Sequence, residues 1–113
     1  MKERSNQYFR MTINSMNAKD LVCVAIGSRR VIEFMYEGRR RRAEPYAAWQ
    51  DDDGNWNLHG WSLGFSKSSS RGGWRNYSLD KMSSVSVADE EFSGVRSGYD
   101  RQSHVCKQSC CCI

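Results

Sequence analysis

The sequence predicts a small, mainly β domain in which one helix precedes a strongly bent, barrel-like sheet. Three observations predict this fold class. One helix-like segment is followed by five short runs of strand-like residues. Turn or loop signals rich in Gly, Asp and Ser separate these runs. The length of 113 residues fits a single domain with one modest core.

The first expected element is a short helix over about residues 17–27, after a lead-in over residues 1–16. Asn17 is a good N-cap residue, and Asp20 favours the positive end of the helix dipole. The run "LVCVAI" supplies an apolar face, and Gly27 is expected to end the helix.

Five strands are expected after the helix, each a short run in which side chains alternate between two faces. Their ranges are 30–36, 39–49, 56–63, 74–79 and 83–88. Pro45 interrupts the second strand and implies a bend or an edge there. The domain is therefore expected to span 17–92. Residues 93–113 show little periodicity and are expected to form a flexible, disordered tail.

The overall composition limits the class of protein. Lys and Arg number 17 against 13 Asp and Glu, a net charge of +4 that attracts polyanions weakly. No stretch approaches the ~20 apolar residues of a membrane span, and no secretory signal is visible. We therefore expect a cytoplasmic protein without a membrane partner. Its five cysteines do not resemble a disulfide framework, which favours a reducing compartment.

The arginine run 39–42 is the strongest charge feature. On a strand, Arg40 and Arg42 share one face, and Arg39 and Arg41 share the other. Four arginines cannot all be buried, so the run lies at an edge or is strongly solvated. It either blocks strand addition or faces an anion, because the guanidinium fork suits phosphate.

The stretch "WNLHGW" places aromatic rings on both faces of one expected strand. Trp56 and Leu58 share one face, and His59 and Trp61 share the other. Trp56 suits a core, whereas the face with His59 and Trp61 is harder to bury. Rings flanked by cations are how proteins hold single-stranded nucleic acids.

The stretch "WRNYSL" repeats this combination of rings and charge. On a strand, Arg75 and Trp74 point to opposite faces, and Tyr77 lies on the same face as Arg75. A buried arginine is costly unless it is paired. Arg75 therefore either pairs with a carboxylate (Glu33, Glu44 or Asp80) or faces a ligand.

Catalytic and metal-binding motifs are weak, so neither catalytic residues, metal ligands nor a cofactor is expected. Ser78 and Lys81 fit S-x-x-K, but no accompanying motif follows. His104 and the four tail cysteines offer zinc-type ligands, yet the adjacent cysteines lack the usual C-x2-C spacing. The protein is expected not to be an enzyme.

Residues of about 20–92 resemble a WYL domain, the ligand-sensing module of many bacterial regulators. The segment "LVCVAIGSRRVIEFMY" is similar to the helix and first strand of that family, ending in Tyr36. "RRAEPY" resembles its arginine-to-proline segment. "WNLHGW" takes the place of Trp-Tyr-Leu, with Asn57 where tyrosine is usual. "WRNYSLDKM" resembles the next family segment, with Tyr77 for Phe and Lys81 for Arg.

The resemblance implies a five-stranded SH3-like or Sm-like barrel and a ligand derived from nucleic acid. It implies ligand roles for Tyr36, Arg42, Trp56, His59 and Arg75, and less directly for Lys81. The face patterns add Arg40, Trp61 and Tyr77. We expect these cations and rings to converge on one wall of the sheet.

The functional hypothesis is a stand-alone regulatory module that binds single-stranded nucleic acid or a nucleotide. Family context suggests transcription regulation or phage defence. Such a module would act through a partner regulator or effector protein, a homo-oligomer or the ligand itself. The alternative is a protein–protein interaction module of SH3-like type, in which Trp49, Trp61 and Trp74 form an exposed aromatic patch.

Overall fold

The computed structural model of the chain describes residues 17–64, 72–101 and 103–113. The helical elements are α2 (Ala18–Ser28), the 3₁₀ turn η1 (Leu79–Lys81) and α3 (His104–Lys107). The strands are β1 (Arg30–Tyr36), β2 (Arg39–Gln50), β3 (Trp56–Leu63), β4 (Gly73–Ser78), β5 (Ser83–Glu91) and β6 (Ser109–Cys112). The predicted lead-in over 1–16 lies outside the described residues.

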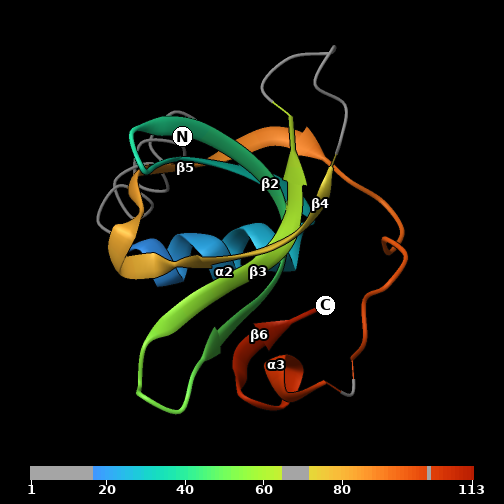
Figure 1. The fold of residues 1–113 in the computed structure, drawn as a ribbon. Coiled ribbons are helices and arrows are strands. Elements are labelled where there is room, and N and C mark those ends of the chain that lie inside the picture. Colours follow the sequence, from blue (N-terminus) through green and yellow to red (C-terminus); the bar gives the residue numbers. More distant parts are fainter. Residues whose placement is uncertain (1–16, 65–71, 102) are drawn as a thin grey trace, which may run out of the picture.

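The strands form one antiparallel sheet in the order β4-β3-β2-β1-β5, with β6 paired to β2. The sheet curves around α2 (Figure 1). This confirms the mainly β class, the helix and the five predicted strands. Within the described ranges β4 and β5 do not pair, so the sheet is not closed into a barrel. The Tyr36 hydroxyl instead bridges part of the gap by accepting a 3.1 Å hydrogen bond from the Ser78 amide.

Helix α2 begins where the sequence predicts and ends slightly later. The Asn17 side chain accepts a 2.9 Å hydrogen bond from the Asp20 amide, as expected of an N-cap. The predicted end at Gly27 is wrong. Arg29 occupies the left-handed C-cap position at φ 55°, and its amide bonds back to the last turn. The apolar face of α2 is buried through Leu21, Val22, Ala25 and Ile26.

The core lies between α2 and the concave face of the sheet, which we call the inner face. Alternate strand residues such as Phe34 and Leu58 supply it, because successive side chains point to opposite sides. The buried cluster consists of Val22, Ala25, Ile26, Ile32, Phe34, Ala43, Ala48, Leu58, Tyr77, Leu79 and Met82. We call the opposite side, which includes Glu33, Arg42, Glu44, Trp61 and Trp74, the outer face.

Pro45 marks a bend, as predicted, but it does not lie on an edge strand. Pro45 pairs with Gly60 and Ala47 pairs with His59, so Tyr46 is an extra residue and β2 bulges. The strand approaches β3 closely at this point. A Cβ atom on Gly60 would lie only 2.7 Å from the Glu44 carbonyl oxygen.

The C-terminal region differs from the expected disordered tail. Helix α3 and strand β6 both form in 93–113, and β6 pairs with Ala47, Ala48 and Trp49 of β2. Strand β1 pairs only with the first half of β2, up to Ala43. The second half of β2 therefore has an edge without β1, and β6 fills it. An unpaired sheet edge favours such pairing, although β6 has no signal of its own in the sequence.

The expectation that the cysteines form no disulfide framework is also not met. Cys23 of α2 is bonded to Cys111 of β6, and Cys106 is bonded to Cys112. The return of the chain along β2 brings Cys111 to Cys23, 88 residues away in sequence, which sequence spacing cannot show.

Candidate functional site

The predicted site residues do not share one wall, and this expectation is wrong. Arg42 pairs across the sheet with Glu33 and Leu63 on the outer face. Arg75 lies two residues before buried Tyr77 and therefore projects from the inner side of β4. Leu63 and Gly60, the β3 partners of Arg42 and Arg75, are three residues apart and face opposite sides, so the register places the two arginines on opposite faces.

Arg40 and Arg42 are engaged with carboxylates of the outer face. Arg42 Nε lies 3.3 Å from Glu33 Oε2, and Arg40 Nη2 lies 3.7 Å from Glu33 Oε1. A second carboxylate, that of Glu90 on β5, also contacts the Arg42 guanidinium. The run is solvated rather than at an edge, because β2 has neighbours on both sides.

The aromatic residues of the outer face form a stack, which we call the outer shelf. The His59 and Trp74 rings are parallel, with centroids 4.9 Å apart and planes inclined by 6°. Trp61 contacts Trp74 edge-on at 5.5 Å. The sequence predicted that His59 and Trp61 would share a face, and the sheet register confirms it.

The outer shelf is covered by residues 93–101 of the chain itself, which we call the strap. Tyr99 stacks on Trp74, with centroids 5.7 Å apart and planes inclined by 24°. Its ring also lies 6.3 Å from that of His59. The Trp74 indole donates a 2.8 Å hydrogen bond to the Ser97 carbonyl. A flat ring already occupies the place that a stacked base would take.

Arg96 anchors the strap through a carboxylate buried in β2. Its Nε and Nη2 atoms each donate a 2.9 Å hydrogen bond to a Glu44 oxygen. Glu44 is only 6% exposed, and this contact raises the pKa of Arg96. The Arg96 guanidinium also lies 5.0 Å from the centre of the Trp61 ring. Glu44 was one of three carboxylates predicted as possible partners of Arg75, but Arg96 pairs with it.

Burial also changes the acid–base behaviour of the shelf. Desolvation lowers the pKa of His59, and a 3.0 Å hydrogen bond between its Nδ1 and the Asn76 side-chain oxygen opposes this effect. Burial raises the pKa of Tyr99. A histidine that remains neutral contributes a flat ring without the charge that would attract phosphate.

A second site, which we call the inner pocket, opens at one end of the inner face. It is a cavity of about 210 Å³ lined by Tyr36, Glu37, Arg41, Arg75, Asn76 and Tyr77. Arg41 Nε donates a 3.4 Å hydrogen bond to the Tyr36 carbonyl. Arg75 is exposed and makes no ion pair with any carboxylate in the described parts of the chain. Two arginines against one glutamate leave this pocket positive.

Tyr77 lines this pocket at the edge of the hydrophobic core. The residue is 2% exposed, and its ring packs edge-on against Phe34 and Tyr36. Its hydroxyl is buried and has no hydrogen-bond partner among the described residues. Such an atom costs about 1–3 kcal/mol when it is left unpaired.

Two further predicted residues lie apart from both sites. Trp56 lies four residues before Gly60, which is the β4-facing partner of Arg75. Along β3 the backbone of Trp56 is therefore about 13 Å from that of Gly60. Its half-buried ring packs on the core, and the Lys19 ammonium lies 4.5 Å from its centre. Lys81 is exposed on η1 and does not line the inner pocket.

A larger cavity of about 420 Å³ lies on the outer face but has the wrong charge for phosphate. Three glutamates, Glu44, Glu90 and Glu91, line it against two arginines, Arg42 and Arg96. Both arginines already pair with those or neighbouring carboxylates. We therefore favour the inner pocket as the anion site.

Three residues at these sites, Arg41, Arg96 and Tyr99, are not among the predicted site residues. A signal existed for Arg41, because the alternation that places Arg42 outside places Arg41 on the side of Tyr36. No comparable signal existed for Arg96 and Tyr99, which lie in a segment without periodicity and are placed by contacts with distant strands.

The fold and this site define the class of protein. It is a small domain in which a curved antiparallel sheet surrounds one helix, with a positive pocket at one end of the sheet. The WYL domain model matches residues 18–87, more than half of the chain. The chain therefore belongs to the WYL domain family, as the resemblance implied.

One solved structure to which the chain is similar is proteasome accessory factor B/C (PafBC) of Arthrobacter aurescens. The TM-score is 0.58 at 23% sequence identity, and the match covers 74% of this chain. It covers 13% of the PafBC chain, so this chain spans a small part of that protein. At this identity the likeness concerns the fold. Among curated proteins no sequence matches the chain. No described helix is long and apolar enough to cross a membrane.

Proposed function

We propose that this WYL domain is a regulatory binding module, not an enzyme, that takes single-stranded nucleic acid or a nucleotide at the inner pocket. One observation carries the proposal. Arg75, which is exposed and has no ion pair among the described residues, lines the same cavity as Arg41 and the aromatic residues Tyr36 and Tyr77. A ligand with an anionic group would pair with the Arg75 guanidinium.

The size of the pocket limits how the ligand binds. Sites for drug-sized ligands usually measure about 300–1,000 Å³, whereas this cavity measures about 210 Å³. One phosphate with its sugar, or one base, matches that volume better than a dinucleotide does. We infer that one nucleotide unit enters and that any further strand runs along the neighbouring arginines of β2. The adjacent Tyr36 supplies the aromatic ring for stacking.

Membership of the WYL family supports a role in regulation, because WYL domains are the ligand-sensing modules of many bacterial regulators. The finer assignment to transcription control or phage defence is part of the proposal. A partner regulator or effector protein, or self-association, would convert ligand binding into an effect. The alternative of a peptide-binding patch has less support, because Trp49, Trp61 and Trp74 are only partly exposed.

The test is fluorescence anisotropy of the full chain with labelled oligo-dT and oligo-U, with unlabelled mononucleotides as competitors. Two phosphates neutralised on a single strand give a slope of roughly −1.4 in log K against log salt. Affinity should then fall roughly sevenfold between about 50 and 200 mM salt. Removing the Arg75 contact by Arg75→Ala should lower the affinity and roughly halve this slope.

The matched control is Arg101→Ala, which removes the same charge from an exposed residue at the end of the strap. Its affinity and salt slope should stay near those of the wild type. Binding that is absent at low salt, or that responds equally to Arg75→Ala and Arg101→Ala, would contradict the proposal.

A further inference from the structure

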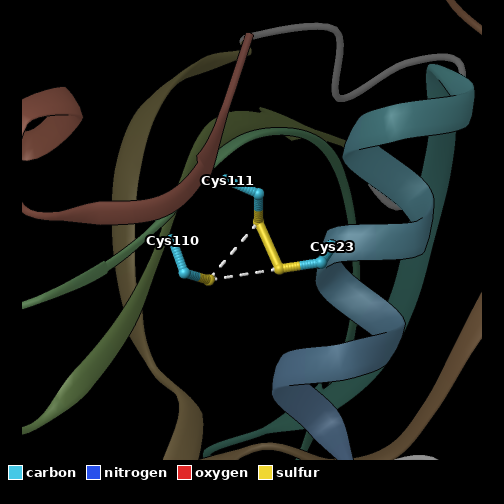
Figure 2. A group of neighbouring side chains, drawn as sticks. All are labelled: Cys23, Cys110 and Cys111. Carbon is cyan, nitrogen blue, oxygen red and sulfur yellow. Dashed lines mark hydrogen bonds between the residues drawn. A yellow bond between two sulfur atoms is a disulfide. The ribbon is translucent and has the colours of Figure 1, made fainter.

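Three cysteine sulfurs meet between α2 and β6. Cys23 projects from the helix toward Cys110 and Cys111 of β6 (Figure 2). The Cys23 and Cys110 sulfurs are 3.3 Å apart, and the Cys110 and Cys111 sulfurs are 3.7 Å apart. All three sulfurs lie within 4.8 Å of one another. Cys110 carries a free thiol, while Cys23 and Cys111 are disulfide-bonded in this state.

This arrangement does not suit thiol–disulfide exchange by Cys110. An attacking thiolate must approach along the axis of the S–S bond, beyond the sulfur that it attacks. In that position the thiolate is farther from the second sulfur than from the first by about the length of the S–S bond. The Cys110 sulfur is instead nearly equidistant from the other two, at 3.3 Å from Cys23 and 3.7 Å from Cys111. The Cys110 sulfur therefore lies to the side of the Cys23–Cys111 bond and not on its axis.

The same triangle does suit a metal ion. Thiolates bind zinc at about 2.3 Å in a tetrahedral shell, so their sulfurs lie about 3.8 Å apart. The 3.7 Å separation of the Cys110 and Cys111 sulfurs matches this value, and the 3.3 Å separation is close to it. Once the disulfide is reduced, only a small side-chain movement separates Cys23 from Cys111. Adjacent cysteines usually point apart on a strand, but here both sulfurs reach the helix.

We propose that the reduced chain binds one thiophilic divalent ion, such as Zn²⁺, through the thiolates of Cys23, Cys110 and Cys111. A dithiol reductant donates two electrons and two protons to the Cys23–Cys111 bond and is itself oxidised to a disulfide. The metal then displaces the protons of three thiols and forms three metal–sulfur bonds. Disulfide and metal are thus alternative links between α2 and β6. Cys110 is exposed, which leaves an entry path and room for a fourth ligand from solvent.

The test uses the full chain, reduced with a phosphine and then freed of metal. Zinc uptake is measured by elemental analysis, by competition with a chromogenic chelator and by Co²⁺ absorption, which reports tetrahedral thiolate coordination. We expect one ion per wild-type chain and tighter binding as the pH rises, because binding releases protons. Chains oxidised with diamide should take up none.

Cys110→Ser is the decisive variant, because Cys110 takes no part in either disulfide and its loss leaves both bonds available. It should weaken zinc binding by more than the roughly 10–100-fold that follows loss of a second-shell partner. Cys23→Ser should do the same. Cys106→Ser, the matched control from the other disulfide, should bind as the wild type does. Wild-type affinity in Cys110→Ser, an equal loss in Cys106→Ser, or no uptake by the reduced wild type would overturn the proposal.

Discussion

The contact between Arg96 and Glu44 gives the sharpest stability prediction. Arg96→Ala removes two 2.9 Å hydrogen bonds from a carboxylate that is 6% exposed. Breaking a buried ion pair typically costs about 3–5 kcal/mol. The Arg96 side chain is 43% exposed, so water reaches the vacated side of Glu44 and lessens the penalty. We expect the free energy of unfolding to fall by about 2–3 kcal/mol.

The assay is urea denaturation followed by tryptophan fluorescence, at one fixed redox state for all variants. Glu44→Gln and the double variant complete a double-mutant cycle. Because the amide carries no charge, the double variant should lose less than the sum of the two single variants. A loss below about 0.5 kcal/mol for Arg96→Ala, or simple additivity in the cycle, would refute the view that Arg96 neutralises a buried charge.

Three further predictions test the shelf, the bulge and the helix cap. The lowered pKa of His59 means that the unfolded chain binds the proton more readily, so stability should fall as the pH drops below about 6.5. His59→Gln should remove this component from stability curves measured by denaturation at several pH values. Gly60→Ala places a Cβ 2.7 Å from a backbone oxygen and should cost about 1–3 kcal/mol, whereas Gly73→Ala has open space and should cost far less; equal losses by thermal denaturation would contradict this. Asn17→Ala removes the bond to the Asp20 amide and should cost about 1 kcal/mol, with Asn17→Ser near neutral; calorimetric melting of both variants checks the order.

The strap and the Cys106–Cys112 disulfide are linked through Tyr99. The Tyr99 hydroxyl lies 3.1 Å from the Cys106 sulfur and donates or accepts at Cys112 beside it, while its ring lies on the outer shelf. The Cys106–Cys112 disulfide therefore contacts the strap that covers His59 and Trp74. Contacts that hold β6 in place therefore also hold the strap over the outer shelf.

Much of the fold could be predicted from local patterns. Alternation of side chains predicted the five strands, and Asn17 with Asp20 predicted the start of α2, because caps and strand periodicity depend on neighbours in sequence. The alternation also placed His59 and Trp61 on one face. It placed Arg42 and Arg75 within their own strands, but it could not relate the faces of two different strands.

The amino-acid sequence by itself determined the order of α2 and of β1 to β5, the β class and the WYL family, since these rest on spacing within short segments. Only the tertiary structure decided which side of the sheet each arginine serves, that Arg96 rather than Arg75 neutralises Glu44, and that Cys23 meets Cys110 and Cys111. Those pairings depend on how far the sheet curves and on which edge of β2 remains unpaired. Both are set by contacts between residues distant in sequence, where no local preference applies.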